Sequence, residues 1–328
     1  MNLLILLFLL AVGIFLLIRS SGYLISALSA ISKQLHLSKF VISFLLLSLA
    51  TSLPELSVGI NAAIAKESVL SLGDVLGTNI VNIALILGLV AIIGGGIKVQ
   101  DYHSFKQIRL ITLVIVVAPF LLLLDGTLSR LDGVLLLGLF VFRLWLFAKD
   151  NGYIESAYHL HLSDKNHSPS ATAKKKLMHQ FIRFFISAVV LIGSAYLVVS
   201  SVVGMSELLG VSSFVIGLFV VAIGTSLPEL MIGLRSVSSH SESISVGNIF
   251  GAITINASLV LGIVAIIHPI QVESFAQYLV PAVVTLLSIS LVYWFLRSKH
   301  TITRPQGLLL IAVYIAFIII QAQSGVGF

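Results

Sequence analysis

The six residues TSLPEL occur twice in the chain, at 51–56 and at 225–230, and both copies lie inside long apolar stretches. A constant shift of 174 residues relates the copies, and it aligns 40–93 with 214–267 without a gap. A register kept over this length indicates one structural unit that the sequence contains twice. Each apolar stretch contains a proline and a carboxylate near its middle, where both residues are unfavourable. Their function at this position is therefore the question to answer.

The apolar stretches are long enough to cross a membrane. A membrane-spanning helix needs about 20 predominantly apolar residues, and this chain of 328 residues is 58% hydrophobic and only 10% charged. Ten candidate spans lie at 1–18, 40–65, 69–95, 108–124, 134–148, 181–203, 214–237, 244–267, 278–296 and 308–320. We therefore expect an all-α polytopic membrane protein with ten transmembrane helices, rather than a soluble domain.

The longest hydrophilic stretch divides the predicted spans into five and five. It runs over 149–180, contains DKNHSPSATAKKK, and has no apolar periodicity, which is typical of a linker. The predicted domains are a five-helix repeat at 1–148 with its motif at 50–88, a cytoplasmic linker, and a second repeat at 181–328 with its motif at 224–262. Because each repeat has an odd number of crossings, we expect inverted repeats, which are typical of transporters with a substrate site near the midplane.

The basic residues predict the orientation of the chain. If the N-terminus faces outward, only Lys66 and Arg130 fall on the outer side, with Arg143 inside a span, and the other Lys and Arg residues lie on the cytoplasmic side. This asymmetry follows the positive-inside rule. We therefore predict a multi-pass protein of the cell inner (cytoplasmic) membrane with both termini extracytoplasmic. The net charge of +6 then reflects topology, and no nucleic-acid partner is expected. The absence of cysteine excludes disulfides and thiolate metal sites.

The proline of each motif is expected to break its helix. Pro54 and Pro228 have no N–H group, and the proline ring clashes with the carbonyl group four residues earlier. The carbonyl groups near Ala50 and Gly224 thereby lose their helical hydrogen bonds, and inside a bilayer such groups must face protein or water. The sequence thus predicts two discontinuous helices that offer carbonyl oxygens at mid-membrane depth.

Polar side chains surround each predicted break at helical spacing. Thr51 and Ser52 precede Glu55 by four and three residues, so the three side chains can share one helix face. In the following span, Thr78 and Asn82 are four residues apart. The candidate metal-ligating residues of both copies are Glu55, Glu229, Thr51, Ser52, Thr225, Ser226, Asn82, Asn256 and Thr78. They supply carboxylate, amide, hydroxyl and carbonyl oxygens, the ligands that hard cations such as Ca²⁺ and Na⁺ prefer.

The free-energy cost of burying the two glutamates limits which ligands the site can bind. A carboxylate at the bilayer centre costs at least about 2.5 to 3.5 kcal/mol on insertion scales, and no Lys or Arg lies near Glu55 or Glu229 in its own span. Two glutamates that face each other repel unless cations or protons occupy the site. The negative charge of the two glutamates can be balanced by one Ca²⁺ ion, by a few Na⁺ ions or by protons. Competition among these ions for one site is the physical basis of exchange.

Structural explanations of the same residues stay open. The glutamates could be buried, protonated carboxyl groups, and the hydroxyl groups could donate back to helix carbonyl groups. The two asparagines could join neighbouring helices through hydrogen bonds. A further pattern, G-x-x-x-G at Gly73 and Gly77, predicts a close helix approach, which we expect between the second and third spans of each repeat.

At these residues the sequence resembles the cation/Ca²⁺ exchanger superfamily, and within it the prokaryotic sodium/calcium exchanger membrane protein family. The resemblance rests on ATSLPEL…GDVLGTNIVN and GTSLPEL…GNIFGAITIN and covers nearly the whole chain. It implies a secondary antiporter, not an enzyme, that exchanges cytoplasmic Ca²⁺ for Na⁺ by alternating access. In that mechanism the first and sixth spans slide against the rest of the bundle. Ca²⁺ and Na⁺ are then transported ions, and the protein is expected to act as a monomer in the lipid bilayer.

The resemblance also assigns roles to the candidate residues. It implies that Glu55 and Glu229 are the central Ca²⁺ ligands, with backbone oxygens near Thr51 and Thr225 completing the shell. The flanking Na⁺ sites would be lined by Ser52, Thr78, Asn82 and Ser226.

Three positions stand apart from this pattern. Ala252 replaces the Ser or Thr that is common in the second repeat, and Asn256 stands where many members carry Asp. The Na⁺ stoichiometry and the K⁺ dependence therefore do not follow from the resemblance. Asp74, whose counterpart in the second repeat is Asn248, is interpreted as a carboxylate of the ion pathway rather than as a central ligand.

Other functions fit the sequence less well. A Ca²⁺/H⁺ or K⁺-coupled antiporter on the same scaffold is the main alternative, although the many hydroxyl groups favour Na⁺, because a proton needs only the carboxylates. A Ca²⁺ channel normally places rings of ligands around a pore axis, whereas inverted repeats place them in the membrane plane. An intramembrane hydrolase is disfavoured because the sequence contains no HExxH and no G-x-S-x-G motif.

Overall fold

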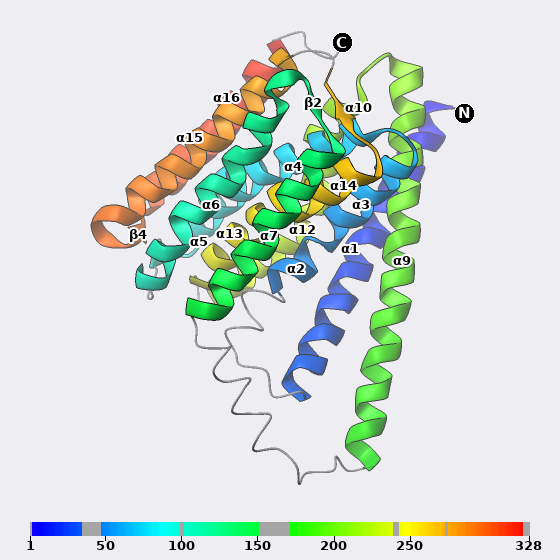
Figure 1. Ribbon diagram of the computed structural model, residues 1–328. Coiled ribbons are helices and arrows are strands. Elements are labelled where there is room, and N and C mark those ends of the chain that lie inside the picture. The colour runs from blue at the N-terminus through cyan, green and yellow to red at the C-terminus, as the bar shows by residue number, and fades with distance from the viewer. Residues whose placement is uncertain are drawn as a thin grey trace.

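The computed structural model describes residues 2–34, 47–98, 102–150, 171–238, 243–272 and 275–323, and most of them are helical (Figure 1). The first half contains α1 (Leu3–Gln34), α2 (Leu47–Thr51), α3 (Leu53–Ile64), α4 (Ser68–Ile80), η2 (Val81–Ile86), α5 (Leu87–Ile93), α6 (Tyr102–Leu122), η3 (Leu123–Asp125) and α7 (Arg130–Asp150). The second half contains α9 (Ala171–Leu209), α10 (Ser213–Ile216), η4 (Gly217–Val221), α11 (Ala222–Thr225), α12 (Leu227–Ser238), α13 (Ser243–Ile255), η5 (Asn256–Val260), α14 (Leu261–Ile267), α15 (Phe275–Lys299) and α16 (Arg304–Gln323). Residues 151–170 of the predicted linker and 40–46 of the second predicted span lie outside the described residues.

Seven helical stretches in the described part of the chain are long and apolar enough to cross a membrane. They are Leu3–Ala27, Ser68–Ile93, Met178–Leu209, Ser213–Ser238, Ser245–Ile267, Tyr278–Arg297 and Arg304–Gln323. The other predicted spans fall on α7 and on the shorter apolar helices Leu53–Ile64 and Leu110–Asp125. The protein is therefore a mostly helical, multi-pass membrane protein, and the number of ten spans stays a prediction.

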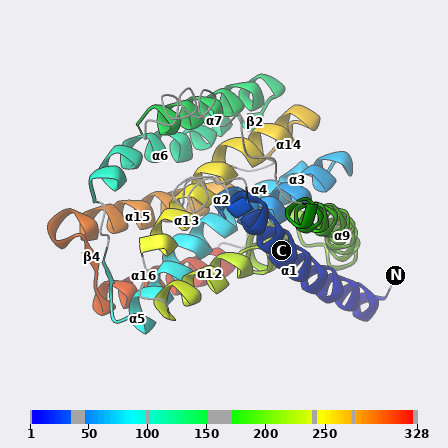
Figure 2. The ribbon, with the colours of Figure 1, turned by 90° about the horizontal axis from the view of Figure 1, so that it is seen from below.

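Two spans form the centre of the bundle. Ser68–Ile93 and Ser245–Ile267 are 78% and 83% buried inside the protein, whereas the first and last spans are only 28% buried. On the outer helices, large apolar side chains such as Phe185 and Trp294 are exposed. An apolar outer surface of this kind suits lipid rather than water. Figure 2 shows α4 and α13 in the middle of the bundle, with α1 and α9 at its edge.

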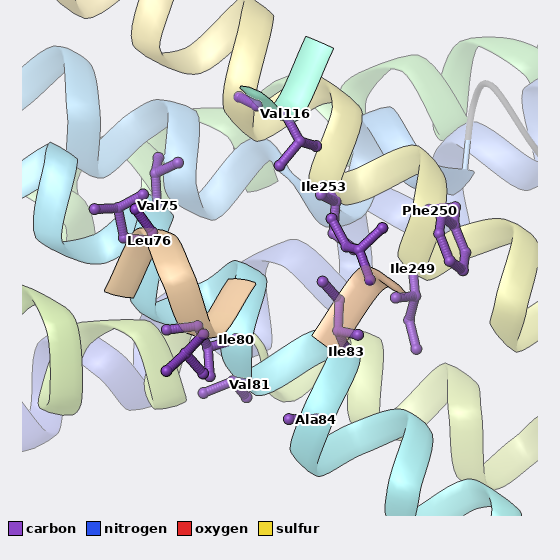
Figure 3. Close-up of a cluster of buried hydrophobic side chains, with 14 of the residues drawn as sticks. Val75, Leu76, Ile80, Val81, Ile83, Ala84, Val116, Ile249, Phe250 and Ile253 are labelled. Carbon is purple, nitrogen blue, oxygen red and sulfur yellow. The ribbon is translucent and has the colours of Figure 1, made fainter. Parts of the chain in front are cut away.

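The main apolar core surrounds these two central spans, and part of it is shown in Figure 3. The labelled side chains come from α4 and η2 (Val75, Leu76, Ile80, Val81, Ile83, Ala84), from α13 (Ile249, Phe250, Ile253) and from α6 (Val116). Both halves of the chain therefore contribute to one core, and neither half buries its central span without the other.

A second apolar cluster joins α1 to α9. The two helices lie side by side and run in opposite directions (Figures 1 and 2). Leu10 and Leu17 of α1 and Ala195 and Val199 of α9 are buried in this cluster, which also includes Val58 of α3. The pair thus packs on the rest of the bundle through an interface separate from the main core.

Both TSLPEL motifs contain the predicted helix break. The helix is interrupted at Ser52, between α2 and α3, and at Ser226, between α11 and α12. Ser52 has φ −84° and ψ 3°, and Ser226 has φ −79° and ψ −2°, so the two breaks have the same conformation. Pro54 and Pro228 lie in the first turn of the helix that follows each break, where a missing N–H group is tolerated.

Pairs of contacts repeat at the same shift along the sequence. A Cβ atom added at Gly88 of α5 would lie 2.8 Å from the carbonyl oxygen of Gly307 of α16. Similarly, a Cβ atom added at Gly133 of α7 would lie 2.7 Å from the carbonyl oxygen of Gly262 of α14. The shift of 174 residues converts Gly88 into Gly262 and Gly133 into Gly307. The two crossings are therefore equivalent contacts in which each half of the chain supplies the partner of the other.

Four short strands form two antiparallel pairs, and each pair joins a strand of the first half to a strand of the second half. β1 (Ile97–Lys98) pairs with β4 (Thr301–Ile302), with Ile97 opposite Ile302. β2 (Thr127–Leu128) pairs with β3 (Ile270–Gln271), with Leu128 opposite Ile270. The labels β2 and β4 lie at opposite ends of the bundle in Figure 1. Each pair thus joins the two halves of the chain at one end.

Candidate cation site

The two motif glutamates are buried close to each other. Glu55 lies in the first turn of α3 and Glu229 in the first turn of α12, and their exposed fractions are 0% and 1%. The carboxylates are close enough for their charges to interact. Glu55 also interacts with the hydroxyl group of Thr225, and Glu229 with that of Thr51, but neither contact has the geometry of a hydrogen bond. Each glutamate thus faces the break of the opposite motif.

The hydroxyl groups at the breaks are buried, and most of them donate to helix carbonyl groups. Thr51 Oγ1 donates to the Ser48 carbonyl oxygen at 3.2 Å, and Ser226 Oγ donates to that of Ala222 at 2.7 Å. The structural explanation of these hydroxyl groups is therefore correct in part, although Ser52 Oγ is buried without a hydrogen-bond partner. A hydroxyl group that donates its hydrogen keeps oxygen lone pairs, so such a bond does not prevent it from binding a cation.

Asp74 of α4 is buried beside the two motif glutamates, and its role as a pathway carboxylate stays a prediction. Its side chain has an exposed fraction of 0%, and its Oδ1 atom accepts hydrogen bonds from Thr225 Oγ1 at 3.0 Å and from Thr78 Oγ1 at 3.4 Å. Its charge also interacts with those of Glu55 and Glu229. The sequence contains a signal for this position, because Asp74, Thr78 and Asn82 follow one another at intervals of four residues and therefore share one helix face.

The second half of the chain makes the equivalent contact with an amide. Thr51 Oγ1 donates to Asn248 Oδ1 at 3.5 Å, and Ser48 Oγ donates to the Asn248 carbonyl oxygen at 3.3 Å. The contact from Thr225 to Asp74 and the contact from Thr51 to Asn248 are related by the repeat, but only the first includes a carboxylate. Of these two related contacts, only the one on the α4 side includes a charged group.

The close approach predicted for Gly73 and Gly77 is present, but the expected partner is wrong. A Cβ atom added at either glycine would overlap a backbone carbonyl oxygen, that of Phe214 or of Leu218 respectively. These partners belong to α10 and η4 of the second half, and not to the second span of the same repeat. The glycines therefore bring α4, with Asp74 and Thr78, against the helix that carries the opposite break.

The two asparagines lie where the central spans change from α-helix to π-helix. Asn82 is the second residue of η2, and Asn256 is the first residue of η5. Single π-helical turns occur often at functional sites, and no pattern in the sequence predicted them here. Both side chains are fully buried, and neither amide group has a hydrogen-bond partner. The interpretation that these residues join helices through hydrogen bonds is therefore not supported.

The candidate set consists of the nine predicted residues and Asp74, and it offers many oxygens but few acidic groups. Charge interactions or hydrogen bonds connect Glu55, Glu229, Asp74, Thr51, Thr225 and Thr78, whereas the side chains of Ser52, Asn82 and Asn256 are buried without a hydrogen-bond partner in the part of the chain that the structure describes. The described residues contain no cluster of three or more His, Cys, Asp or Glu side chains with metal-binding geometry. A cation here would instead be held by a mixture of carboxylate, amide, hydroxyl and carbonyl oxygens. Hard cations are bound by such mixed oxygen sets. A site of this kind binds and releases an ion without making or breaking a covalent bond.

Comparisons with known proteins agree with this chemistry. The family model described as "Sodium/calcium exchanger protein" matches residues 5–149 and 179–323. Sodium/calcium exchanger MaX1 of Methanosarcina acetivorans is 30% identical over 346 residues, which cover 95% of this chain and 97% of that protein. Inner membrane protein YrbG of Escherichia coli is 32% identical over 320 residues, which cover 94% of each chain.

A solved structure shares the fold. The sodium-calcium exchanger NCX_Mj, soaked with Na⁺ and Sr²⁺, superposes with a TM-score of 0.66 at 27% identity. The match covers 97% of this chain and 99% of that chain.

Proposed function

Because the chain belongs to the sodium/calcium exchanger protein family, we propose that it is a secondary antiporter that exchanges Ca²⁺ for Na⁺ by alternating access. Membership of the family makes the protein a cation/Ca²⁺ antiporter, and thus a membrane ion exchanger and not an enzyme. The choice of Na⁺ as the coupling ion, the direction of transport and the mechanism are the parts that we propose.

The proposed architecture consists of two inverted repeats of five transmembrane helices each. The repeats occupy 1–148 and 181–328, and a cytoplasmic linker at 149–180 joins them. Three observations support this arrangement: α1 and α9 run in opposite directions, the two strand pairs lie at opposite ends of the bundle, and the helix breaks at Ser52 and Ser226 have the same conformation. An inverted pair brings both breaks to the same depth in the membrane.

The proposed ion site lies between the two breaks. Glu55 and Glu229 bind Ca²⁺ there, together with backbone oxygens near Thr51 and Thr225. The remaining ligands, which also serve the Na⁺ ions, are Ser52, Ser226, Thr78, Asn82 and Asn256. Na⁺ and Ca²⁺ compete for the same glutamates, so the binding of one ion favours the release of the other.

One observation carries this proposal. Both oxygens of Glu55, both oxygens of Glu229 and both amide atoms of Asn82 and Asn256 are buried without a hydrogen-bond partner. An unpaired polar group that is buried costs about 1 to 3 kcal/mol, and a charged group costs more. A cation that binds these oxygens removes this free-energy cost. Without a bound cation or proton the cost remains, so the empty site is unfavourable.

The proposed alternating access is a movement of α1 and α9 against the rest of the bundle. The separate apolar cluster between this pair and the other helices supports such a movement, because apolar contacts are not directional and do not fix one relative position. The protein is proposed to lie in the cytoplasmic membrane as a monomer with both termini extracytoplasmic. The start of α1 and the end of α16 lie toward the same end of the bundle in Figure 1, in agreement with an even number of crossings.

The test of the coupling ion is Ca²⁺ uptake into proteoliposomes with a single driving gradient. Vesicles that contain the purified protein are loaded with Na⁺ and diluted into Na⁺-free medium with radioactive Ca²⁺, and parallel samples receive only a K⁺ gradient or only a pH gradient. We expect uptake with the Na⁺ gradient alone. Uptake driven by a pH gradient without Na⁺ would refute Na⁺ coupling and identify the Ca²⁺/H⁺ alternative.

The test of the ion site is the loss of one carboxylate at a time. Glu55→Gln and Glu229→Gln are expected to abolish Ca²⁺ uptake while the protein still inserts into the membrane. Glu207→Gln is the matched control, because Glu207 is exposed on α9 and the chemical change is the same. Exchange at the wild-type rate in either site variant would contradict the assignment.

A further inference from the structure

The two halves of the site differ at two positions of the central spans. Four pairs of ligands are identical in both repeats: Thr51 and Thr225, Ser52 and Ser226, Glu55 and Glu229, and Asn82 and Asn256. In contrast, Asp74 and Thr78 of α4 correspond to Asn248 and Ala252 of α13. One carboxylate and one hydroxyl group therefore occur only on the α4 side. The shift of 174 residues relates these positions, so the difference lies in their side chains.

Asp74 has one anchored oxygen and one unpaired oxygen. Oδ1 accepts hydrogen bonds from Thr225 and Thr78, which fix the orientation of the carboxylate. Oδ2 is buried in the same site and has no hydrogen-bond partner. The two hydrogen bonds to Oδ1 orient the carboxylate. The same orientation leaves Oδ2 without a partner inside the site. A charged oxygen in this environment needs a cation or a proton.

Three oxygens beside Asp74 lie within hydrogen-bond distance of one another, a spacing close to that of neighbouring ligands of one cation. Thr78 Oγ1 lies 3.2 Å from Thr225 Oγ1 and 3.5 Å from the Ala222 carbonyl oxygen. Thr225 Oγ1 lies 3.3 Å from the same carbonyl oxygen. Ligands bound to one cation at about 2.3 to 2.6 Å and at right angles to each other lie about 3.3 to 3.7 Å apart. Na⁺ has nearly the radius of Ca²⁺, so the observed spacing suits either ion.

Charge decides between these two ions. Asp74 interacts electrostatically with both Glu55 and Glu229, so the site contains three carboxylates. A bound Ca²⁺ ion balances two negative charges and leaves one. Among the described residues the only buried basic side chain is that of Arg143, and it belongs to α7, which supplies none of the site residues. The third carboxylate therefore needs a monovalent cation or a proton.

We propose that Asp74 is a third carboxylate ligand of this exchanger and binds one Na⁺ ion together with Thr78 and Thr225, beside the Glu55–Glu229 pair. The inference rests on the proposed function, because it adds a ligand to the same site. The mirror position binds no such ion, because Asn248 is neutral and Ala252 has no hydroxyl group.

The decisive variant is Asp74→Asn, which keeps the size and the shape of the side chain. An amide can accept the hydrogen bonds from Thr225 and Thr78 at its oxygen, so a purely structural or protonated Asp74 would be replaced without effect. If Asp74 is charged and binds an ion, its replacement by asparagine should change ion binding. The mirror variant Asn248→Asp and the double variant Asp74→Asn/Asn248→Asp are the matched controls, because they add a carboxylate on the other side or move it there.

The measurement is the Na⁺ dependence and the Ca²⁺ dependence of exchange in proteoliposomes. For Asp74→Asn we expect the half-saturating Na⁺ concentration to rise about tenfold, since one charge-assisted interaction is lost, and the Hill coefficient for Na⁺ to fall by about one. The half-saturating Ca²⁺ concentration should change less than the Na⁺ value. The double variant should recover part of the Na⁺ dependence through its restored charge.

The possible results separate this inference from the proposed function. Wild-type protein without Na⁺-driven Ca²⁺ exchange refutes the function itself. Wild-type exchange together with unchanged Na⁺ dependence in Asp74→Asn refutes only the role of Asp74. If Asp74→Asn does not insert as a folded protein, Thr78→Ala gives the answer, because Ala already occupies the equivalent position 252. An unchanged half-saturating Na⁺ concentration in Thr78→Ala then overturns the proposal.

Discussion

Gly77 lies at a very close contact between the two halves, and its replacement by alanine tests how the site is assembled. An added Cβ atom would overlap the Leu218 carbonyl oxygen and would lie 2.6 Å from the Ala222 Cβ atom, whereas ordinary contacts begin at 3.4 Å. The nearest atoms belong to a backbone and to a short side chain, so no rotamer change can relieve the overlap. α4 and the helix that contains η4 and α11 must therefore separate by about 1 Å, because packed interiors have little free space.

Two opposing effects set the magnitude. Overpacking of this kind costs about 1 to 3 kcal/mol, whereas a change from glycine to alanine in a helix gains up to about 1 kcal/mol. Gly138→Ala is the matched control, because Gly138 lies in α7 and a Cβ atom added there would have no neighbour within 4 Å. The difference in the free energy of unfolding between Gly77→Ala and Gly138→Ala then isolates the packing cost, which we expect to be about 1 to 3 kcal/mol.

The assay is thermal unfolding of the purified variants in one detergent, followed by ion transport with the folded fraction. At about 2 °C per kcal/mol, we expect the unfolding midpoint of Gly77→Ala to lie about 2 to 6 °C below that of Gly138→Ala. The separation also moves Thr78 away from the Ala222 carbonyl oxygen, so Gly77→Ala should weaken the binding of Ca²⁺ and Na⁺ alike. A midpoint of Gly77→Ala equal to or above that of Gly138→Ala would refute the close contact.

Three further results are expected from the same structure. Chelation of Ca²⁺ should lower the unfolding midpoint of the wild type, because a ligand that binds only the folded state stabilises it, but should leave that of Glu55→Gln unchanged. Tyr278→Phe removes a buried hydrogen bond of 2.8 Å to the Leu123 carbonyl oxygen and should destabilise the protein by about 1 to 3 kcal/mol in denaturation assays. Ser71→Ala should not lower the midpoint, because Ser71 Oγ is buried without a partner; a clear decrease would contradict this description.

The sequence predicts the features of this protein that depend on local chemistry. The missing N–H group of Pro54 acts on the helix turn that contains it, and the predicted break is present at Ser52. The doubled motif and its polar residues likewise lead to the exchanger family, which the family model and the relatives confirm. The roles of the candidate ligands stay predictions, although the structure brings Glu55 and Glu229 together.

Features that depend on the contact between the halves could not be read from the sequence. The G-x-x-x-G pattern at Gly73 predicts a close approach, but a pattern within one helix does not identify the helix opposite it. The π-helical turns at Asn82 and Asn256 have no local signature in composition or spacing. For Asp74, the interval of four residues to Thr78 indicates a shared face, but only the contact with Thr225 shows that this face is turned toward the site.

Gly77 and Asp74 lie less than one helical turn apart on α4, and their variants separate two causes that a single substitution at the site would confuse. Gly77→Ala changes the position of the helix and leaves every charge in place, so it should weaken Ca²⁺ and Na⁺ binding together. Asp74→Asn leaves the shape of the helix surface unchanged and removes one charge, so it should affect Na⁺ more than Ca²⁺. If both variants shift the two ions by the same factor, the carboxylate acts only through the position of α4, and the asymmetry between the repeats has no part in the choice of ion.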